Sequence, residues 1–203
     1  EKFFNQYGKL IAGVAAGVVV VAIAVFCYVK FAYQPAVAEA QGQMALAEQN
    51  FRAADYEVAL NGDGNVLGFN QIIDEYGAKA GEAVYFYAGV CNLQLGNFQE
   101  AISNLKKYNG EDEILAARAL ACIGDAQASL NDLAAAISSY KAAAAKADNV
   151  LAASYMLKAG ILLEETGKPA EALKLYEEIK TKYPATPEGN EINKYISRIN
   201  NAK

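Results

Sequence analysis

The sequence predicts an all-α protein in which one membrane-spanning helix precedes a solenoid of stacked helical hairpins. Three observations support this prediction. A run of 20 residues near the N-terminus contains no charged side chain. Three later segments repeat the same pattern of small and large residues at nearly constant spacing. Hydrophobic residues make up 54% of the chain and many of them are alanine, which favours closely packed helices.

The uncharged run extends from Leu10 to Val29 and would form a helix about 30 Å long, the thickness of a bilayer's hydrocarbon core. Eleven of its residues are Leu, Ile, Val or Phe. On the insertion scale they favour the membrane by roughly 3 to 7 kcal/mol. Lys9 and Lys30 bracket the run. Aromatic residues flank it at both ends, as in the belts of spanning helices: Phe3, Phe4, Tyr7, Tyr28, Phe31 and Tyr33.

Three alternatives to an uncleaved anchor fit the sequence less well. A signal peptide cleaved at Ala36–Ala38 would have a shorter apolar run, without Lys30 before the site. A lipoprotein signal ending at Cys27 would have a small residue in place of Phe26. A buried soluble helix would rarely be so long and so free of polar residues. The sequence therefore predicts an anchor, although its start at Glu1 and not Met leaves room for earlier native residues.

Charge predicts the orientation of this anchor. Lys2 and Lys9 precede it and Lys30 follows closely, which favours an N-terminus on the inside. Residues 31–203 carry 15 basic and 22 acidic side chains, so this part has little attraction for nucleic acid or anionic lipid. In a bacterium it would lie outside the cytoplasm. Gly13 and Gly17 form a GxxxG pair that predicts a contact with another spanning helix.

The repeated segments begin at Tyr87, Ala121 and Lys158, and they share three kinds of small residue. Corresponding residues are 35 and 36 positions apart. Each unit is therefore predicted to be two antiparallel helices that cross at small residues and join at a left-handed turn. The corresponding residues are Gly89, Gly124 and Gly160 at the first crossing position, Gly96, Asn131 and Gly167 at the turn, and Ala101, Ala136 and Ala172 in the second helix.

This pattern resembles the tetratricopeptide repeat over roughly residues 80–184, with Tyr85, Leu120 and Met156 at the family's tryptophan position. The resemblance implies a groove, lined by the first helices, that holds a partner segment. Phe86 and Arg118 are the strongest candidates, because aromatic and Arg side chains dominate binding hot spots. The implied groove residues are Phe86, Val90, Leu93, Gln94, Arg118, Ala121, Asp125, Ala128, Ser154, Leu157, Ile161, Glu164 and Glu165.

Upstream of these units, apolar residues at heptad spacing predict a long helix entered at Pro35. This helix would either be separate from the anchor or continue from it as a stalk. A second helix with Phe69 and Ile72 on one side would complete a divergent hairpin, and the intervening Asn61–Asn65 segment is interpreted as a turn. The heptad positions are Val37, Met44, Phe51 and Val58, accompanied by Ala40, Ala47 and Ala54. The predicted organisation is a cytoplasmic segment 1–9, a spanning helix 10–30, a stalk 31–60, repeats 61–184 and a capping helix 185–203.

Nothing in the composition favours an enzyme. Without histidine there are no Ser-His or Cys-His nucleophile pairs and no imidazole ligands. Cys27, Cys91 and Cys122 lack CxxC spacing, which argues against a zinc site or a disulfide framework. Adjacent carboxylates such as Glu164 and Glu165 point about 100° apart on a helix. We expect no catalytic site, metal or cofactor.

The segment "KFFNQYGKLIAGVAAGVVVVAIAVFCYVKF", Lys2 to Phe31, is similar in design to the N-terminus of the YfgM-type ancillary subunit of the bacterial Sec translocon. The rest of the chain matches that family by architecture. The resemblance implies a single-pass protein of the bacterial inner membrane with a cytoplasmic N-terminus and a periplasmic repeat domain. Its partners would be translocon channel subunits, exported polypeptides or periplasmic chaperones. Two alternatives remain open: a scaffold in another envelope or secretion assembly, and a homo-oligomeric structural protein.

Overall fold

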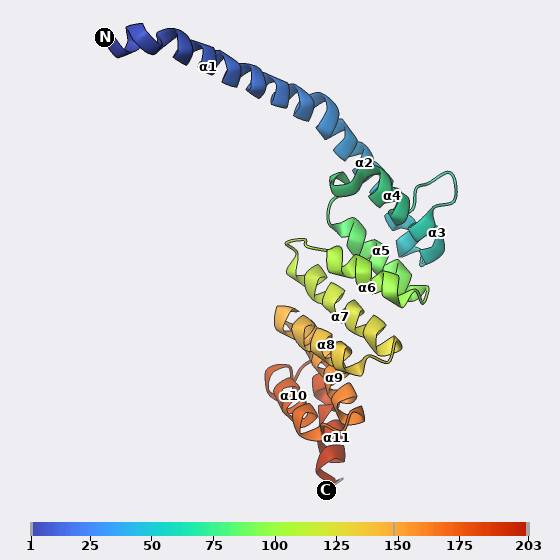
Figure 1. Cartoon of the computed structure of the whole chain (residues 1–203). Coiled ribbons are helices and arrows are strands. Elements are labelled where there is room, and N and C mark those ends of the chain that lie inside the picture. The colour runs from blue at the N-terminus through green and yellow to red at the C-terminus, as the bar shows by residue number, and fades with distance from the viewer. Residues whose placement is uncertain (1, 148, 202–203) are drawn as a thin grey trace.

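The computed structural model describes residues 2–147 and 149–201, and every regular element in them is helical, which confirms the all-α prediction. A long helix leaves one end of a stack of shorter helices, and the two chain ends lie far apart (Figure 1). After the long helix, the elements are α3 (Tyr56–Asn61), α4 (Phe69–Tyr76), the 3-10 turn η2 (Gly77–Ala80), α5 (Ala83–Gln94), α6 (Phe98–Lys107), α7 (Glu113–Ser129), α8 (Leu133–Ala147), α9 (Val150–Glu165), α10 (Pro169–Lys182) and α11 (Pro187–Asn201).

The long helix consists of α1 (Lys2–Tyr28), the π-helical turn η1 (Val29–Tyr33) and α2 (Gln34–Arg52), and it runs without interruption. In η1 the Gln34 N–H donates to the Val29 carbonyl, five residues back. The wide turn directly precedes Pro35, which has no N–H of its own to give to the helix. The stalk is therefore continuous with the apolar segment, and it bends only gently (Figure 1).

The apolar part of this helix is not covered by the rest of the chain. Val18 and Phe26 are each 64% exposed, and the most apolar window has a mean hydropathy of 2.6 with none of it buried. Within the described residues, this is the one helix long and apolar enough to cross a membrane. The side chains of residues 2–6, 8, 9 and 11 are not described, so Phe3, Phe4, Lys2 and Lys9 cannot be placed against the predicted interfaces.

The remaining helices form helix–turn–helix units that share one backbone motif. In each unit a residue with positive φ ends the first helix: Ala54 (60°), Gly96 (81°), Asn131 (61°) and Gly167 (73°). The N–H of the next residue then donates to a carbonyl five positions earlier, at 2.8–3.0 Å. This is the Schellman arrangement, which satisfies carbonyls at a helix C-terminus. We call the units 1 (α2–α3, followed by α4), 2 (α5–α6), 3 (α7–α8) and 4 (α9–α10).

Unit 1 corrects the predicted N-terminal hairpin. The heptad pattern placed Ala54 and Val58 in one long helix, but α2 ends at Arg52 and the chain turns at Ala54. The second helix of the hairpin is α3, interrupted by a loop over residues 62–68 before α4 resumes. Ala47 and Ala59 occupy the positions of Gly89 and Ala101, and both are fully buried. Unit 1 thus has alanine where unit 2 has glycine, both at the crossing (Ala47 for Gly89) and at the turn (Ala54 for Gly96). For this reason the spacing of glycines did not indicate this first copy of the repeat.

The first crossing glycine of units 2, 3 and 4 lies against a large side chain of the second helix. A Cβ at Gly89 would stand 2.5 Å from the Leu105 Cγ. At Gly124 and Gly160 it would stand 2.7 and 2.3 Å from Cε1 of Tyr140 and Tyr176. Glycine is therefore required for the close approach of the two helices. The large side chain follows the repeated alanine of the second helix (Ala101, Ala136 or Ala172) by four residues, which is one helical turn.

Helix α11 closes the far end of the stack. Ile192 is fully buried and Ile199 is 5% exposed, and both belong to one core cluster with residues of α9 and α10. Tyr195 and Ile196 are partly buried against the same cluster. All four belong to α11, which lies within the range 185–203 predicted as a capping helix.

Candidate protein-binding surface

The first helices of successive units contact one another through side chains, and we call the surface they form the first-helix face. Phe51 of α2 and Tyr87 of α5 have ring centroids 5.0 Å apart. The Arg118 guanidinium of α7 lies 5.9 Å from the centre of the Phe86 ring of α5. Two ion pairs then join α7 to α9 and α9 to α11. The contacts change along the face from aromatic to ionic.

Phe86 and Arg118, the two strongest candidates, are neighbours with different exposure. Phe86 is only 3% exposed and packs edge-on against Tyr87 and Tyr108, at 5.7 and 5.9 Å. The structure therefore places Phe86 in the core and not on the open face. Arg118 is exposed above its ring, and within the described residues no carboxylate pairs with it. Arg118 is thus the group of this pair that a partner could reach.

Asp125 holds three helices together. Its Oδ1 accepts a hydrogen bond from the Tyr140 hydroxyl of α8 at 2.6 Å. The same atom accepts from Lys158 Nζ of α9, also at 2.6 Å. Burial and the bond to this carboxylate raise the pKa of the Tyr140 hydroxyl, which stays protonated as a donor. Asp125 is therefore occupied within the solenoid.

Glu164 repeats this arrangement one unit later. Its Oε1 accepts from the Tyr176 hydroxyl at 2.6 Å and from Arg198 Nη2 at 2.7 Å, and its Oε2 accepts from Arg198 Nε at 3.1 Å. Burial raises the pKa of the Glu164 carboxyl, but the bonds from Arg198 and Tyr176 outweigh it, and the net pKa is lowered. The bidentate pair with Arg198 fixes α11 to α9.

The other candidates on this face differ in how open they are. Gln94 is exposed and Ile161 is 40% exposed, whereas Val90, Leu93 and Leu157 are half-buried. Of the secondary positions, Glu165 is exposed, Ala128 and Ser154 are half-buried, and Ala121 is buried. The accessible members of the predicted set are therefore Arg118, Gln94, Ile161 and Glu165.

Sequence reasoning missed the partners of the acidic candidates. The spacing of small residues indicates nothing about Tyr140, Tyr176, Lys158 or Arg198 as hydrogen-bond donors. One feature of the sequence could have indicated them. In units 3 and 4 the second helix carries a tyrosine, and the first helix of the same unit carries a carboxylate. The cations come from α9 and α11, 33 and 34 residues beyond the carboxylate, and only the stacking of the helices brings them close.

The thiols of buried Cys91 and half-buried Cys122 offer no nucleophile at neutral pH. Burial raises the pKa of Cys91 to about 12 and that of Cys122 to about 11. A thiol with such a pKa is almost entirely protonated at pH 7. Among the described residues, no three His, Cys, Asp or Glu side chains are grouped to hold a metal ion.

Gly13 and Gly17 lie on the uncovered helix, and an added Cβ at either would meet nothing within 4 Å in this chain. The backbone is therefore open to close approach along this stripe. Contact with a second spanning helix stays a prediction.

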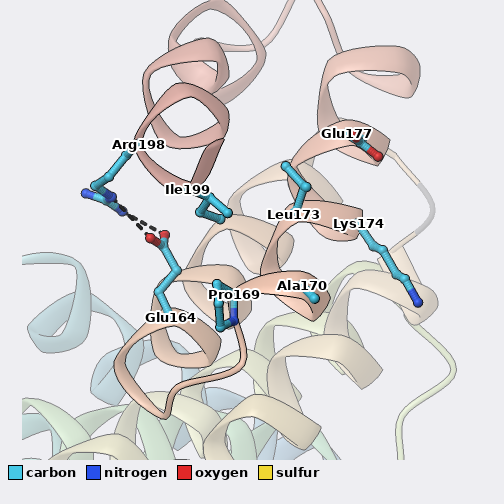
Figure 2. Close-up of a pocket in the computed structure, with 8 residues that line it drawn as sticks. All are labelled: Glu164, Pro169, Ala170, Leu173, Lys174, Glu177, Arg198 and Ile199. Atoms are coloured by element: carbon cyan, nitrogen blue, oxygen red, sulfur yellow. Dashed lines mark hydrogen bonds and ion pairs between the residues drawn. The ribbon is translucent and has the colours of Figure 1, made fainter. Parts of the chain in front are cut away.

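A pocket of about 460 Å³ opens at the distal end, between the end of α9, α10 and α11. Leu173 and Ile199 point toward its centre, the Glu164–Arg198 ion pair bounds one side, and Lys174 and Glu177 stand on the other (Figure 2). Of the predicted groove residues, Glu164 is the one that borders it.

Comparison with known proteins identifies the repeat. A family model of the tetratricopeptide repeat matches residues 154–186, which contain most of unit 4. Two crystal structures of MamA are similar in fold, both at 18% sequence identity. One has a TM-score of 0.57 and covers 76% of this chain and 92% of that chain. The other has a TM-score of 0.59 and covers 79% and 89%. A search of curated proteins found no match.

These findings support the fold assignment reached from geometry. The chain has a tetratricopeptide-type solenoid behind a long apolar helix. Solenoids of this type bind other proteins on extended surfaces. The first-helix face and the distal pocket are two candidate surfaces for such binding.

Proposed function

We propose that the chain is a single-span membrane adaptor that holds a protein-binding solenoid close to the bilayer. Its finer role would be that of an accessory subunit of the bacterial Sec translocon, receiving or handing on exported polypeptides. The orientation proposed is a cytoplasmic N-terminus with the solenoid in the periplasm. The similarity of residues 2–31 to the Sec-associated family supports this role, and the solenoid fold supports a binding function.

The observation that carries the proposal is the continuity of the helix from α1 to α2. Its N-terminal part is apolar and uncovered, while Ala40, Met44 and Ala47 further along are buried in unit 1. One continuous helix would thus belong to both the anchor and the solenoid. From Val29 to Ala40 the helix rises only about 16 Å, at about 1.5 Å per residue. An anchored solenoid would therefore be held just above the lipid surface.

The proposed partner contact on the first-helix face centres on Arg118. Its guanidinium lies over the Phe86 ring and has no carboxylate partner within the described residues, so it can receive an acidic group. Ile161 on α9 adds exposed apolar surface. This combination suits a polypeptide segment with both acidic and apolar residues. The paired Asp125 and Glu164 would contribute to the shape of the face and not directly to binding.

Purification of the full chain in mild detergent, followed by mass spectrometry of what accompanies it, tests the proposal. Recovery of translocon channel subunits together with exported chains or periplasmic chaperones is the expected result. Recovery of another envelope machine, or of this chain alone, would contradict the translocon role. Extraction of the chain from membranes by alkaline carbonate would contradict the anchor.

Two variants assign the contacts. Arg118→Glu should reduce recovery of exported chains several-fold, while Lys180→Glu on α10, also exposed, serves as the matched control. Replacing Gly13 and Gly17 by leucine should release channel subunits if the small-residue stripe is the contact in the membrane. Unchanged recovery with either variant removes that surface from the proposal.

A further inference from the structure

The distal pocket between α10 and α11 corresponds to a position that is filled one unit earlier. Its residues Leu173 and Ile199 are each 36 positions after Ile137 and Leu163. Ile137 is 7% exposed and Leu163 is 1% exposed, and both share a core cluster with residues of α10. In the pocket, Leu173 is only half-buried. Ile199 is 5% exposed, so the difference lies at Leu173, where the apolar surface that a helix covers in one unit is partly open in the next.

The covering element one unit earlier is the second helix of unit 4. Leu175 of α10 packs against the cluster of Ala136, Tyr140 and Ala159, which belongs to units 3 and 4. Glu171 of α10 also reaches back to Lys141 of α8, with Nζ and Oε2 3.3 Å apart. A helix with an aliphatic face and a charge at its edge is therefore what this surface accepts.

At the distal pocket the corresponding position carries an acidic residue in place of a basic one, with Lys174 one turn before it on α10. Glu177 stands 36 positions after Lys141 and occupies the corresponding place on α10. Within the described residues no cation is paired with its carboxylate. A helix that settles here would therefore be favoured by a Lys or Arg where α10 carries Glu171. A second copy of α10 would instead bring its own Glu171 against Glu177, which argues against self-association through this surface.

The crossing position also differs. Ile196 of α11 stands 36 positions after Gly160, which accommodates the Tyr176 ring in unit 4. With isoleucine there, a bulky side chain at the crossing would clash, so the incoming helix must carry alanine or glycine at that place.

We propose that the pocket between α10 and α11 binds an amphipathic helix of a partner protein, with an alanine-rich aliphatic face and a basic residue opposite Glu177. This helix takes the place that the second helix of a further unit would fill. The site lies at the end of the solenoid opposite α1 (Figure 1), and Glu164 at its border is the residue that it shares with the predicted groove. It extends the proposed function without depending on it.

The test uses a peptide built from the chain's own α10, residues 169–182, held helical by a hydrocarbon staple because so short a helix is marginal alone. It carries Glu171→Lys and Tyr176→Ala. Binding of the fluorescent peptide to the detergent-solubilised full chain is measured by anisotropy. We expect saturable binding that Glu177→Lys weakens at least tenfold, while Glu100→Lys, an exposed control on α6, leaves it unchanged. Leu173→Glu should abolish binding.

A charge exchange separates docking from a general effect on folding. The peptide that retains Glu171 should bind the native chain at least tenfold more weakly, and Glu177→Lys should restore its binding. No saturable binding of the Lys peptide, or equal binding to the native chain and Glu177→Lys, overturns the proposal. A chain that self-associates in sedimentation and is dissociated by Leu173→Glu would assign the pocket to a second copy and would likewise overturn it.

Discussion

Units 1 and 2 are held together differently from units 3 and 4 with α11. In the first half, rings from Phe51 to Tyr108 form a connected cluster with centroids 5.0–6.4 Å apart. In the second half, tyrosine hydroxyls and ion pairs cross between helices. Among the described residues, every ion pair between two different helices lies within residues 113–198. One backbone repeat thus supports two kinds of junction.

The difference comes largely from one position of the repeat. Leu105 in unit 2 corresponds to Tyr140 and Tyr176 in units 3 and 4, and all three lie against a glycine. The tyrosines fill the same space but add a hydroxyl, which then requires an acceptor inside the solenoid. Asp125 and Glu164 supply it, and a cation from the next first helix (Lys158) or from α11 (Arg198) completes each network. The apolar junctions should therefore be insensitive to pH and the polar ones sensitive.

The largest expected effect comes from adding a methyl group at a crossing glycine. Gly160→Ala should destabilise unit 4 by about 2–3 kcal/mol, because Tyr176 is fixed by its hydrogen bond and cannot move away. Gly89→Ala should cost about 1–2 kcal/mol, since Leu105 has no such bond and can change rotamer. Urea unfolding of the detergent-solubilised chain measures both. Gly42→Ala, in an exposed part of α2 with nothing near the new Cβ, is the control and should be neutral or slightly stabilising. Equal losses at Gly89 and Gly160 would contradict the distinction.

Removing the charge of Glu164 tests the polar junction next. Glu164→Gln should destabilise the docking of α11 by about 1–2 kcal/mol at neutral pH, because Arg198 and Tyr176 lose an ionised acceptor. The pKa of Glu164 is lowered below its ordinary 4.5 in the folded chain. Its contribution is thus fully present above about pH 4.5 and is lost as the pH falls through the folded pKa. Hydrogen exchange should show that α11 is better protected in the native chain than in the variant at pH 7, and that this difference in protection is smaller at pH 3. A gap independent of pH would mean that shape, and not charge, matters here.

The turn of unit 1 gives a smaller effect of opposite sign. Ala54 has φ 60°, a left-handed conformation that costs a residue with a Cβ about 1–2 kcal/mol. Ala54→Gly removes this strain but adds freedom to the unfolded chain, so the net stabilisation should be about 0.5–1 kcal/mol. Gly96→Ala at the same position of unit 2 should destabilise by a similar amount. Thermal unfolding of the two variants decides, and shifts of the same sign would refute the shared turn.

The smallest effect belongs to the partly exposed ion pair between units 3 and 4. A double-mutant cycle of Asp125→Asn and Lys158→Met should give a coupling of only about 0.5 kcal/mol, because the side chains are 34% and 43% exposed. High salt should reduce this coupling further. A coupling above about 2 kcal/mol that persists in salt would contradict this prediction, because it would mean that the pair behaves as a buried ion pair.

The sequence by itself determined the class of fold, the position of the long apolar helix and the register of units 2 to 4. Spacing sufficed there because glycine or asparagine at a left-handed turn, and glycine at a tight crossing, are local requirements that few other residues satisfy. It failed at unit 1, where alanine takes both glycine places and the second helix is interrupted by a loop.

Only the tertiary structure decided which candidate side chains are exposed and which are already buried or paired within the solenoid. Phe86 is buried by Tyr87 and Tyr108, and Glu164 is occupied by Arg198, 34 residues away. Such pairings depend on how far successive units rotate and slide against each other. That geometry is the sum of many packing contacts, and no single position in the sequence encodes it.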